Sequence, residues 1–337
     1  MHVFTILPSI TRGGLERVFI HYLRMLNELG YVVTAVLHPK SPLISEAKPY
    51  VSSLILSHYS TQRYAHLNVR ACLWLYQVMR RTKPQVILLH NAKNLRYVRH
   101  MRPKNCPIII VNHGTKLKRL QKSDHVIAIT ESMAHALNPV LPSVHLIRNS
   151  LPVYLKKPLL KPISEPIKIG FLGRFTQEKG LPFLLKALTI LKDKKISFKL
   201  YVAGDGDRRV LEHHALHGSI IHLGWIEDVY AFLQSMDMLA IPSRYESFGM
   251  SAIEAMHAGC PVVACNCNGL MDVVIDNITG LIVDRDKPND MADAMLRIIK
   301  DQSLRYKIIH EGYKRVKQYY SLESTKYELE KILTHEL

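Results

Sequence analysis

Short apolar runs alternate along this chain with stretches of helical period, and this alternation constrains the fold more than any other feature. The first run, Val3–Leu7, has strand length. It is followed by apolar residues at the i, i+3, i+4 spacing of one helix face: Leu15, Val18, Phe19, Tyr22, Leu23 and Leu26. Gly30 stands where such a helix would end, and a second run, Val32–Leu37, comes next. This order predicts parallel strands joined by crossover helices.

The alternation is present in both halves of the chain. In the first half, further strands are expected at Val86–Leu89, Ile108–Val111, Val126–Ile129 and Val144–Ile147. In the second half, they are expected at Ile167–Leu172, Phe198–Ala203, Ile220–Leu223, Met238–Ile241, Pro261–Ala264 and Leu281–Val283. Residues 151–166 lie between the two series and hold four prolines and three lysines, which predicts a linker.

The predicted architecture is α/β, with two Rossmann-like parallel-sheet domains facing a cleft at the C-terminal ends of their strands. The 337 residues suit two domains of about 150–170 residues each. We expect an N-terminal domain over residues 1–150, a linker over 151–166 and a C-terminal domain over 167–317. The tail from Ser303 to Leu337 has a helical pattern, and its part 318–337 is expected to pack back on the N-terminal domain.

Positive charge is concentrated in the first half of the chain. Residues 1–150 hold 20 Lys or Arg and 5 Asp or Glu, a net charge of +15, whereas residues 167–337 hold 22 of each. One stretch without any acid carries nine of the cations: Lys93, Arg96, Arg99, Arg102, Lys104, Lys116, Lys118, Arg119 and Lys122. Such a stretch favours an anionic surface or substrate.

Several classes of protein are not favoured by this sequence. The longest apolar runs are far shorter than the roughly 20 residues that span a bilayer, so no transmembrane segment is expected. Residues 1–7 enter a strand pattern directly, so we expect no signal peptide. The five cysteines form no four-ligand zinc pattern with histidine, and free thiols in a reducing cytosol are expected.

The segment 170–180, Gly-Phe-Leu-Gly-Arg-Phe-Thr-Gln-Glu-Lys-Gly, joins a strand to a helix expected over Leu181–Lys192. Its two cations, Arg174 and Lys179, stand among glycines that let a ligand approach the backbone closely. Two converging cations suit a diphosphate. The alternative is an ordinary surface turn with solvated charges.

The segment 242–256, Pro-Ser-Arg-Tyr-Glu-Ser-Phe-Gly-Met-Ser-Ala-Ile-Glu-Ala-Met, follows a buried strand and enters a helix near Gly249. The first amides of a helix stabilise an anion. Glu246 in the loop and Glu254 in the helix supply carboxylates that can accept hydrogen bonds from sugar hydroxyls. The alternative is that Glu246 only interacts with the helix dipole and that Glu254 is solvated, although its neighbours are apolar.

Together these motifs resemble the retaining glycosyltransferases of the GT-B fold, family 4. The resemblance rests on Gly173-Arg174 with Lys179, on Glu246 and Glu254 in a Glu-x7-Glu pattern, and on the apolar run 255–264 that follows. It covers residues 167–300 and extends more weakly to the Gly-Gly-Leu-Glu-Arg-Val segment at 13–18. The first domain would then bind the acceptor and the second the nucleotide sugar.

The resemblance implies a role for each matching residue. Arg174 and Lys179 would hold the donor diphosphate, Glu254 the ribose hydroxyls and Glu246 the transferred sugar. The remaining donor-binding positions would be Gly14, Gly173, Gly204, Ile226, Phe248, Gly249 and Met250. His113, which follows an apolar strand, resembles a histidine that contacts the donor sugar; the alternative is that it caps or packs against the strand.

One loop departs from the family pattern. The family often has Gly-Gly-x-Pro-Glu at the positions that here read Asn268-Gly269-Leu270-Met271-Asp272. The proline is absent and aspartate replaces glutamate. Because this loop lies near the donor in the family, the preference for a particular donor sugar is expected to differ.

The resemblance implies transfer with retention, without metal and without a cofactor, because fixed cations and helix amides can stabilise the leaving diphosphate. The expected donor is a UDP- or GDP-linked sugar, and the expected acceptor is a glycan or glycolipid of the lipopolysaccharide type. The basic first half suggests a cytoplasmic protein bound peripherally to the inner, anionic face of the membrane. A soluble polysaccharide or small-molecule acceptor is the main alternative.

Two other functions have less support. Nucleic-acid binding is suggested by charge alone, since no aromatic interleaving or binding module accompanies it. A dinucleotide oxidoreductase is suggested by paired Rossmann-like domains, but no Gly-x-Gly-x-x-Gly follows the first strand.

Overall fold

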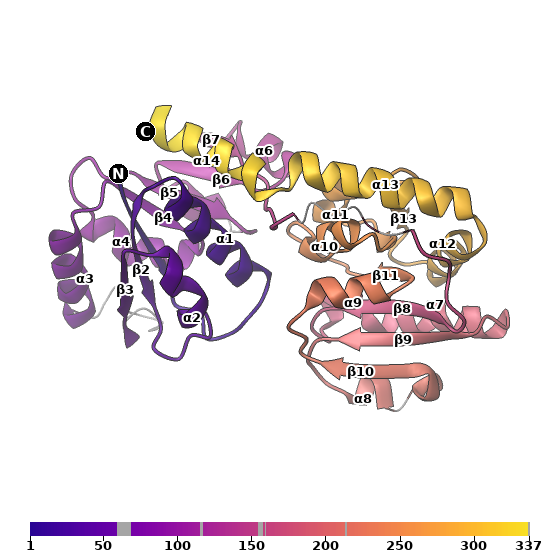
Figure 1. Ribbon diagram of the computed structural model, residues 1–337. Helices are drawn as coiled ribbons and strands as arrows, with labels where there is room; N and C mark the ends of the chain where they lie inside the picture. Colours follow the sequence, from indigo (N-terminus) through magenta and orange to yellow (C-terminus); the bar gives the residue numbers. More distant parts are fainter. Residues whose placement is uncertain (59–68, 115–116, 154–157, 159, 213, 336–337) are drawn as a thin grey trace. The chain divides into compact units, whose positions relative to one another are not determined.

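The computed structural model describes residues 1–58, 69–114, 117–153, 158, 160–212 and 214–335. These residues form two compact units, one of Met1–Ser150 with Leu322–Leu337 and one of Leu151–Ser321 (Figure 1). The described residues of the predicted linker, 151–153, 158 and 160–166, therefore belong to the second unit. The part of the tail that joins the first unit begins at Leu322.

The first unit is built on a parallel sheet of seven strands in the order β3-β2-β1-β4-β5-β6-β7. The strands are β1 (His2–Leu7), β2 (Val32–Leu37), β3 (Ser53–Leu56), β4 (Val86–Leu89), β5 (Ile108–Asn112), β6 (His125–Ala128) and β7 (Val144–Leu146). The central strands are fully buried because their runs of Val, Ile and Leu face helices on both sides. The edge strand β3 was not predicted.

The helices of the first unit follow its strands in alternation, as the sequence predicts. They are α1 (Gly14–Glu28), α2 (Ile44–Ala47), α3 (Val69–Thr82), α4 (Leu95–Met101), α5 (Leu117–Leu120) and α6 (Glu131–Leu137), with 3-10 turns η1 (Lys48–Tyr50) and η4 (Ala92–Asn94). The C-terminal helix α14 (Leu322–His335) lies against α1, where Lys326 Nζ is 3.0 Å from Glu28 Oε2 (Figure 1).

The second unit has a parallel sheet of six strands in the order β10-β9-β8-β11-β12-β13. The strands are β8 (Ile167–Leu172), β9 (Phe198–Ala203), β10 (Ile220–Gly224), β11 (Met238–Ile241), β12 (Val262–Cys265) and β13 (Leu281–Val283). The other elements are η5 (Gln177–Lys179), α7 (Leu181–Asp193), α8 (Arg209–Glu212), η6 (His217–Ser219), α9 (Val229–Ser235), α10 (Met250–Ala258), α11 (Asn268–Val273), α12 (Pro288–Lys300) and α13 (Gln302–Tyr319).

Alternation along the strands gives this second sheet two apolar faces. Ile169 and Phe171 of β8 join the core formed with α7 and α12, while the intervening Gly170 lies under Phe232 of α9. On that second face, α10 packs with α9 and with α13. Both faces are therefore covered, as expected for an all-parallel sheet.

The strand order of the second sheet reverses between β8 and β11. From β8 the chain proceeds outward through β9 and β10, then returns to the other side of β8 and proceeds through β11, β12 and β13. Loops that leave the carboxyl ends of two such neighbouring strands diverge, and the crevice between them is where ligands bind in open α/β sheets. The first sheet reverses in the same way between β1 and β4.

The tail, for which the sequence predicts a helical pattern, contains two helices. Helix α13 ends at Tyr319, and α14 begins at Leu322. Tyr320 and Ser321 break the helix at the position where the chain passes from the second unit to the first. No helix in the described part of the chain is long and apolar enough to cross a membrane.

Candidate active site

The two motifs of the second half follow β8 and β11, the strands between which the sheet reverses. These strands pair directly, with Ile169 opposite Met238 and Gly170 opposite Leu239. The loop after β8 covers residues 173–180 and leads into α7. The loop after β11 covers residues 242–249 and leads into α10. The structure thus brings together two segments that are well separated in the sequence.

The loop after β8 presents its two cations differently. Arg174 is exposed, and no described residue pairs with its guanidinium. Lys179 is half-buried, with 24% of its side chain exposed. One cation is therefore available to a ligand from solvent, while the other is held within the loop.

Gly180 brings this loop against the loop after β11. Its φ of +69° is in the left-handed region, and a Cβ atom there would lie 1.9 Å from the carbonyl oxygen of Pro242. Beside this contact, the amide of Arg244 donates a hydrogen bond of 2.8 Å to the carbonyl of Glu178. Backbone contacts thus hold the two loops close together.

Glu246 is the centre of polar contacts between the loops. Its Oε1 forms an ion pair with Lys179 Nζ and accepts a hydrogen bond of 2.9 Å from Ser243 Oγ. Only 13% of the Glu246 side chain is exposed. Sequence reasoning did not single out Ser243, although it stands three residues before Glu246 in the same motif.

Helix α10 begins directly after the loop that holds Glu246. Gly249 is its N-cap residue, and Met250 is its first residue. Phe248 is buried below the loop, and Glu254 lies half-buried in the second turn. The amide of Ala252 donates to Gly249 O at 3.0 Å, whereas the helix amides before it have no preceding turn to bond to, so this end carries the partial positive charge that favours an anion.

The neighbouring strand ends complete this side of the crevice. The amide of Gly173 donates to Ala203 O at 3.0 Å, and the amide of Gly204 donates to Gly224 O at 2.8 Å. A Cβ atom on Gly204 would lie only 2.0 Å from Gly173 O, so glycine is required there. Ile226, two residues after Gly224, is half-buried, and the intervening Trp225 is exposed. Two of the predicted donor-binding glycines, Gly173 and Gly204, are therefore in direct contact.

His113 and Gly14 belong to the first unit. His113 directly follows β5, and its Nε2 is 3.4 Å from Nδ1 of the buried His90, with the two rings stacked. Desolvation lowers the pKa of both imidazoles below the ordinary value. His113 is therefore neutral near pH 7. Gly14 is the exposed first residue of α1, directly after the β1 loop.

The basic stretch of the first unit is largely at the surface. Lys93, Arg99, Lys104, Lys118 and Lys122 are exposed. Arg102 forms an ion pair with Asp124. Lys116 lies outside the described residues, as does the side chain of Arg96. The stretch thus presents several cations to solvent.

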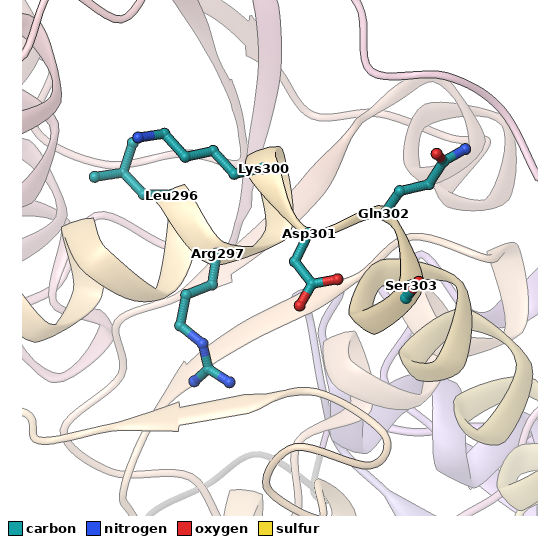
Figure 2. A pocket seen from close by; sticks show the side chains of 6 residues that line it. All are labelled: Leu296, Arg297, Lys300, Asp301, Gln302 and Ser303. Atoms are coloured by element: carbon teal, nitrogen blue, oxygen red, sulfur yellow. The ribbon is translucent and has the colours of Figure 1, made fainter.

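Other features of the described residues do not form a competing site. No group of three or more His, Cys, Asp or Glu residues there is arranged to hold a metal ion. A hollow of about 410 Å³ lies at the junction of α12 and α13, lined by Leu296, Arg297, Lys300, Asp301, Gln302 and Ser303 (Figure 2). Because α12 runs back along the sheet from the carboxyl end of β13, its last turn lies at the edge opposite the crevice. None of the predicted site residues lines this hollow.

Comparison with known proteins places both halves among glycosyltransferases. The family "Glycosyltransferase Family 4" matches residues 12–152, and "Glycosyl transferases group 1" matches residues 156–315. HepE of Anabaena, crystallised with UDP-glucose, superposes with a TM-score of 0.83 over 99% of each chain at 17% identity. Each half of the chain thus matches a glycosyltransferase family model, and the chain as a whole has the GT-B fold of HepE. The predicted fold class is confirmed.

The alignment with curated relatives covers half of the protein in some cases and nearly all of it in others. The chain is 31% identical to an uncharacterised glycosyltransferase of Methanocaldococcus jannaschii, over 45% of this chain and 44% of that protein. The chain thus spans less than half of the first curated relatives it matches. The lipopolysaccharide core biosynthesis glycosyltransferase LpsE of Rhizobium meliloti is 23% identical over 93% of both chains.

Proposed function

We propose that this protein transfers a sugar from a UDP- or GDP-linked donor to a hydroxyl of a cell-envelope glycan or lipid-linked acceptor, with retention and without metal. The observation that carries the proposal is the ion pair of Lys179 and Glu246 at the reversal point between β8 and β11. A cation for phosphate and a carboxylate for sugar hydroxyls stand there side by side, at the edge of a sheet that suits nucleotides.

Lys179 and Glu246 neutralise each other, which offsets the cost of partly burying both charges. A nucleotide sugar offers each a new partner. Its diphosphate attracts Lys179 and the exposed Arg174, and its sugar hydroxyls donate hydrogen bonds to Glu246. The amides that begin α10 add partial positive charge, and Glu254 in the second turn is the proposed acceptor for ribose hydroxyls.

The remaining donor contacts are assigned to glycines and to the first unit. Gly173 lets the donor approach the backbone, and Gly204 and Ile226 border the nucleotide base. Gly14 allows the same approach in the first unit. The neutral His113 supplies a ring nitrogen that exchanges a hydrogen bond with the transferred sugar.

Retention is proposed because the motifs resemble those of retaining glycosyltransferases. Arg174, Lys179 and the α10 amides stabilise the charge that grows on the leaving diphosphate, and no carboxylate is assigned as a nucleophile. The acceptor hydroxyl then attacks on the side from which the diphosphate departs, and the departing phosphate oxygen takes the hydroxyl proton. Analysis of the product anomer tests this step, since inversion contradicts it.

The envelope acceptor and the anionic membrane surface are supported by relatives and by charge. LpsE acts in lipopolysaccharide core biosynthesis, and CapM of Staphylococcus aureus, 30% identical over half of this chain, acts in capsular polysaccharide biosynthesis. In the first unit, α3 exposes Val69, Leu73 and Tyr76 at i, i+4, i+7 spacing. Its exposed arginines, Arg70, Arg80 and Arg81, accompany this stripe without any acid. An apolar stripe flanked by cations suits an anionic lipid surface.

Titration of the protein with UDP and with GDP by calorimetry, in the presence of EDTA, tests the donor assignment. We expect one of the two to bind the wild type, and both Lys179→Ala and Glu246→Ala to abolish sugar transfer while remaining folded. Lys194→Ala is the matched control, because Lys194 forms an exposed ion pair with Asp293 in the same unit. Full transfer activity in Lys179→Ala or Glu246→Ala contradicts the proposal.

A further inference from the structure

Arg315 of α13 holds the end of α11, the short helix that contains the departure from the family pattern. Its Nε donates a hydrogen bond of 3.0 Å to Val273 O, and its Nη2 donates one of 2.9 Å to Asp272 O. These are the last two carbonyls of α11, and no following turn of helix supplies amides that could donate to them. The planar guanidinium presents two donors in a fixed fork that matches both carbonyls, and lysine does not reproduce this geometry.

Tyr320 joins the same carbonyl to the loop before α10. Its hydroxyl lies 3.4 Å from Asp272 O, and its ring meets the ring of Phe248 edge to face at 5.7 Å between centroids. The Arg315 guanidinium also lies over the Tyr320 ring, 5.7 Å from its centroid. Tyr320 is 1% exposed, so these contacts are internal to the second unit.

Helix α11 in turn contacts the residue that pairs with Lys179. The amide of Gly269 donates a hydrogen bond of 3.2 Å to the backbone carbonyl of Glu246. Leu270 is fully buried, and its Cδ2 lies directly beside the position that a Cβ atom on Gly249 would occupy. A displacement of α11 would therefore move both the backbone of Glu246 and the start of α10.

The same tyrosine lies where the chain passes between its two units. Its carbonyl accepts a hydrogen bond of 3.0 Å from the amide of Leu151, and Leu151 forms a β-bridge with Ser321. Residues 150–151 and 321–322 are the two places where the chain leaves one unit for the other. Tyr320 thus contacts the donor loop with its ring and a connecting segment with its backbone.

We propose that Arg315 and Tyr320 are positioning residues that hold α11 and the Glu246 loop in the arrangement needed to bind the donor. Neither is assigned a contact with substrate. The assignment of a donor to this loop rests on the proposed function. The claim that these two residues hold α11 and the loop in place rests only on the contacts of Arg315, Tyr320, Asp272 and Phe248.

Two measurements on the full chain test the proposal with Arg315→Lys. Amide hydrogen exchange of the free protein is expected to accelerate about ten-fold at residues 246–250 and 268–274, because one of the two carbonyl contacts is lost. Calorimetric titration with the nucleotide that binds the wild type, UDP or GDP, is expected to show about ten-fold weaker binding. In transfer assays, KM for the donor should rise more than kcat falls.

Matched variants separate positioning from general loss of structure. Arg297→Lys makes the same change on α12, where Arg297 bonds Asn277, and should leave exchange at 268–274 and nucleotide affinity unchanged. Tyr320→Phe keeps the ring on Phe248 and loses only the long hydroxyl contact, so it should bind nucleotide within two-fold of the wild type. Tyr320→Leu should weaken binding by about ten-fold.

The outcomes distinguish this proposal from the proposed function. Unchanged exchange at 268–274 in Arg315→Lys overturns the positioning role, whatever the wild type binds. Faster exchange with unchanged nucleotide affinity also overturns it. A wild type that binds neither UDP nor GDP contradicts the donor assignment instead, and faster exchange in Arg315→Lys would then establish only the mechanical link.

Discussion

Gly180 lies so close to Pro242 that a single added carbon would reach 1.9 Å from the Pro242 carbonyl oxygen. This contact joins the loop that carries Lys179 to the loop that carries Glu246, and both partners at the contact are backbone. Neither side can therefore adjust by changing a rotamer. The spacing of the proposed donor site depends on the absence of a side chain at position 180.

Gly180→Ala is expected to destabilise the second unit by about 2 kcal/mol or more and to abolish nucleotide binding. The substitution adds left-handed backbone strain to a clash that only separation of the two loops can relieve. Urea denaturation and calorimetric titration measure the two effects. Gly218→Ala is the control, since no atom lies within 4 Å of its added Cβ, and it should change stability by less than about 0.5 kcal/mol. A folded Gly180→Ala with unchanged nucleotide affinity contradicts the assignment.

The ion pair of Lys179 and Glu246 should have a measurable coupling energy. A double-mutant cycle with Lys179→Met and Glu246→Gln is expected to give about 1–2 kcal/mol in urea denaturation, because both groups are largely shielded from water. The exposed pair Lys194 and Asp293 should give less than about 1 kcal/mol. Equal coupling in the two pairs would show that Glu246 is held mainly by Ser243 and the backbone.

The sequence was sufficient to predict most strands, because central parallel strands such as β4, β5, β11 and β12 are buried along their whole length and appear as apolar runs. It was not sufficient for β3. This edge strand is only partly buried, and its Ser-Leu-Ile-Leu run is too short to distinguish from a loop. The sequence places the start of the last helical segment at residue 318, whereas α14 begins at Leu322, because the helical pattern continues through Tyr320 and Ser321 and only the change of packing partner ends it.

The candidate site could be predicted only as two separate motifs. Lys179 and Glu246 are 67 residues apart, and their contact requires β8 and β11 to be neighbours. Alternation of strands and helices is compatible with many strand orders, so it does not specify that pairing. The roles proposed for Arg315 and Tyr320 could not be predicted either. Both residues contact backbone carbonyls of α11, and the sequence does not show which side chain bonds a given carbonyl.

Stability is expected to fall as the pH is lowered from 7.5 to 5, and His21 should account for about 2 kcal/mol of the loss. Burial lowers the pKa of His21 to about 4, and its Nδ1 donates to Ser150 O at 2.7 Å. Below pH 6.5 the unfolded chain therefore binds more protons than the folded one. Urea denaturation at the two pH values measures the difference. His21→Gln should lose less stability over this range than the wild type, and an equal loss contradicts the assignment.

The apolar stripe on α3 predicts binding to anionic lipid. Val69, Leu73 and Tyr76 are 70%, 55% and 46% exposed, which is unusual for three large apolar side chains on one face of a helix. Leu73→Glu places a negative charge at the centre of this stripe, so it both removes apolar area and repels anionic headgroups. We expect it to weaken binding to phosphatidylglycerol-containing vesicles at least ten-fold in a sedimentation assay.

Val140→Glu is the matched control for this experiment. Val140 is also an exposed apolar residue of the first unit, 47% exposed, but it lies in the turn after α6 rather than on α3. It receives the same change of charge, so any loss of binding that comes only from net charge will appear in both variants. Binding of the wild type should decrease as salt screens the arginines Arg70, Arg80 and Arg81. Equal binding of the wild type to neutral and anionic vesicles would contradict a membrane role for α3 and favour a soluble acceptor.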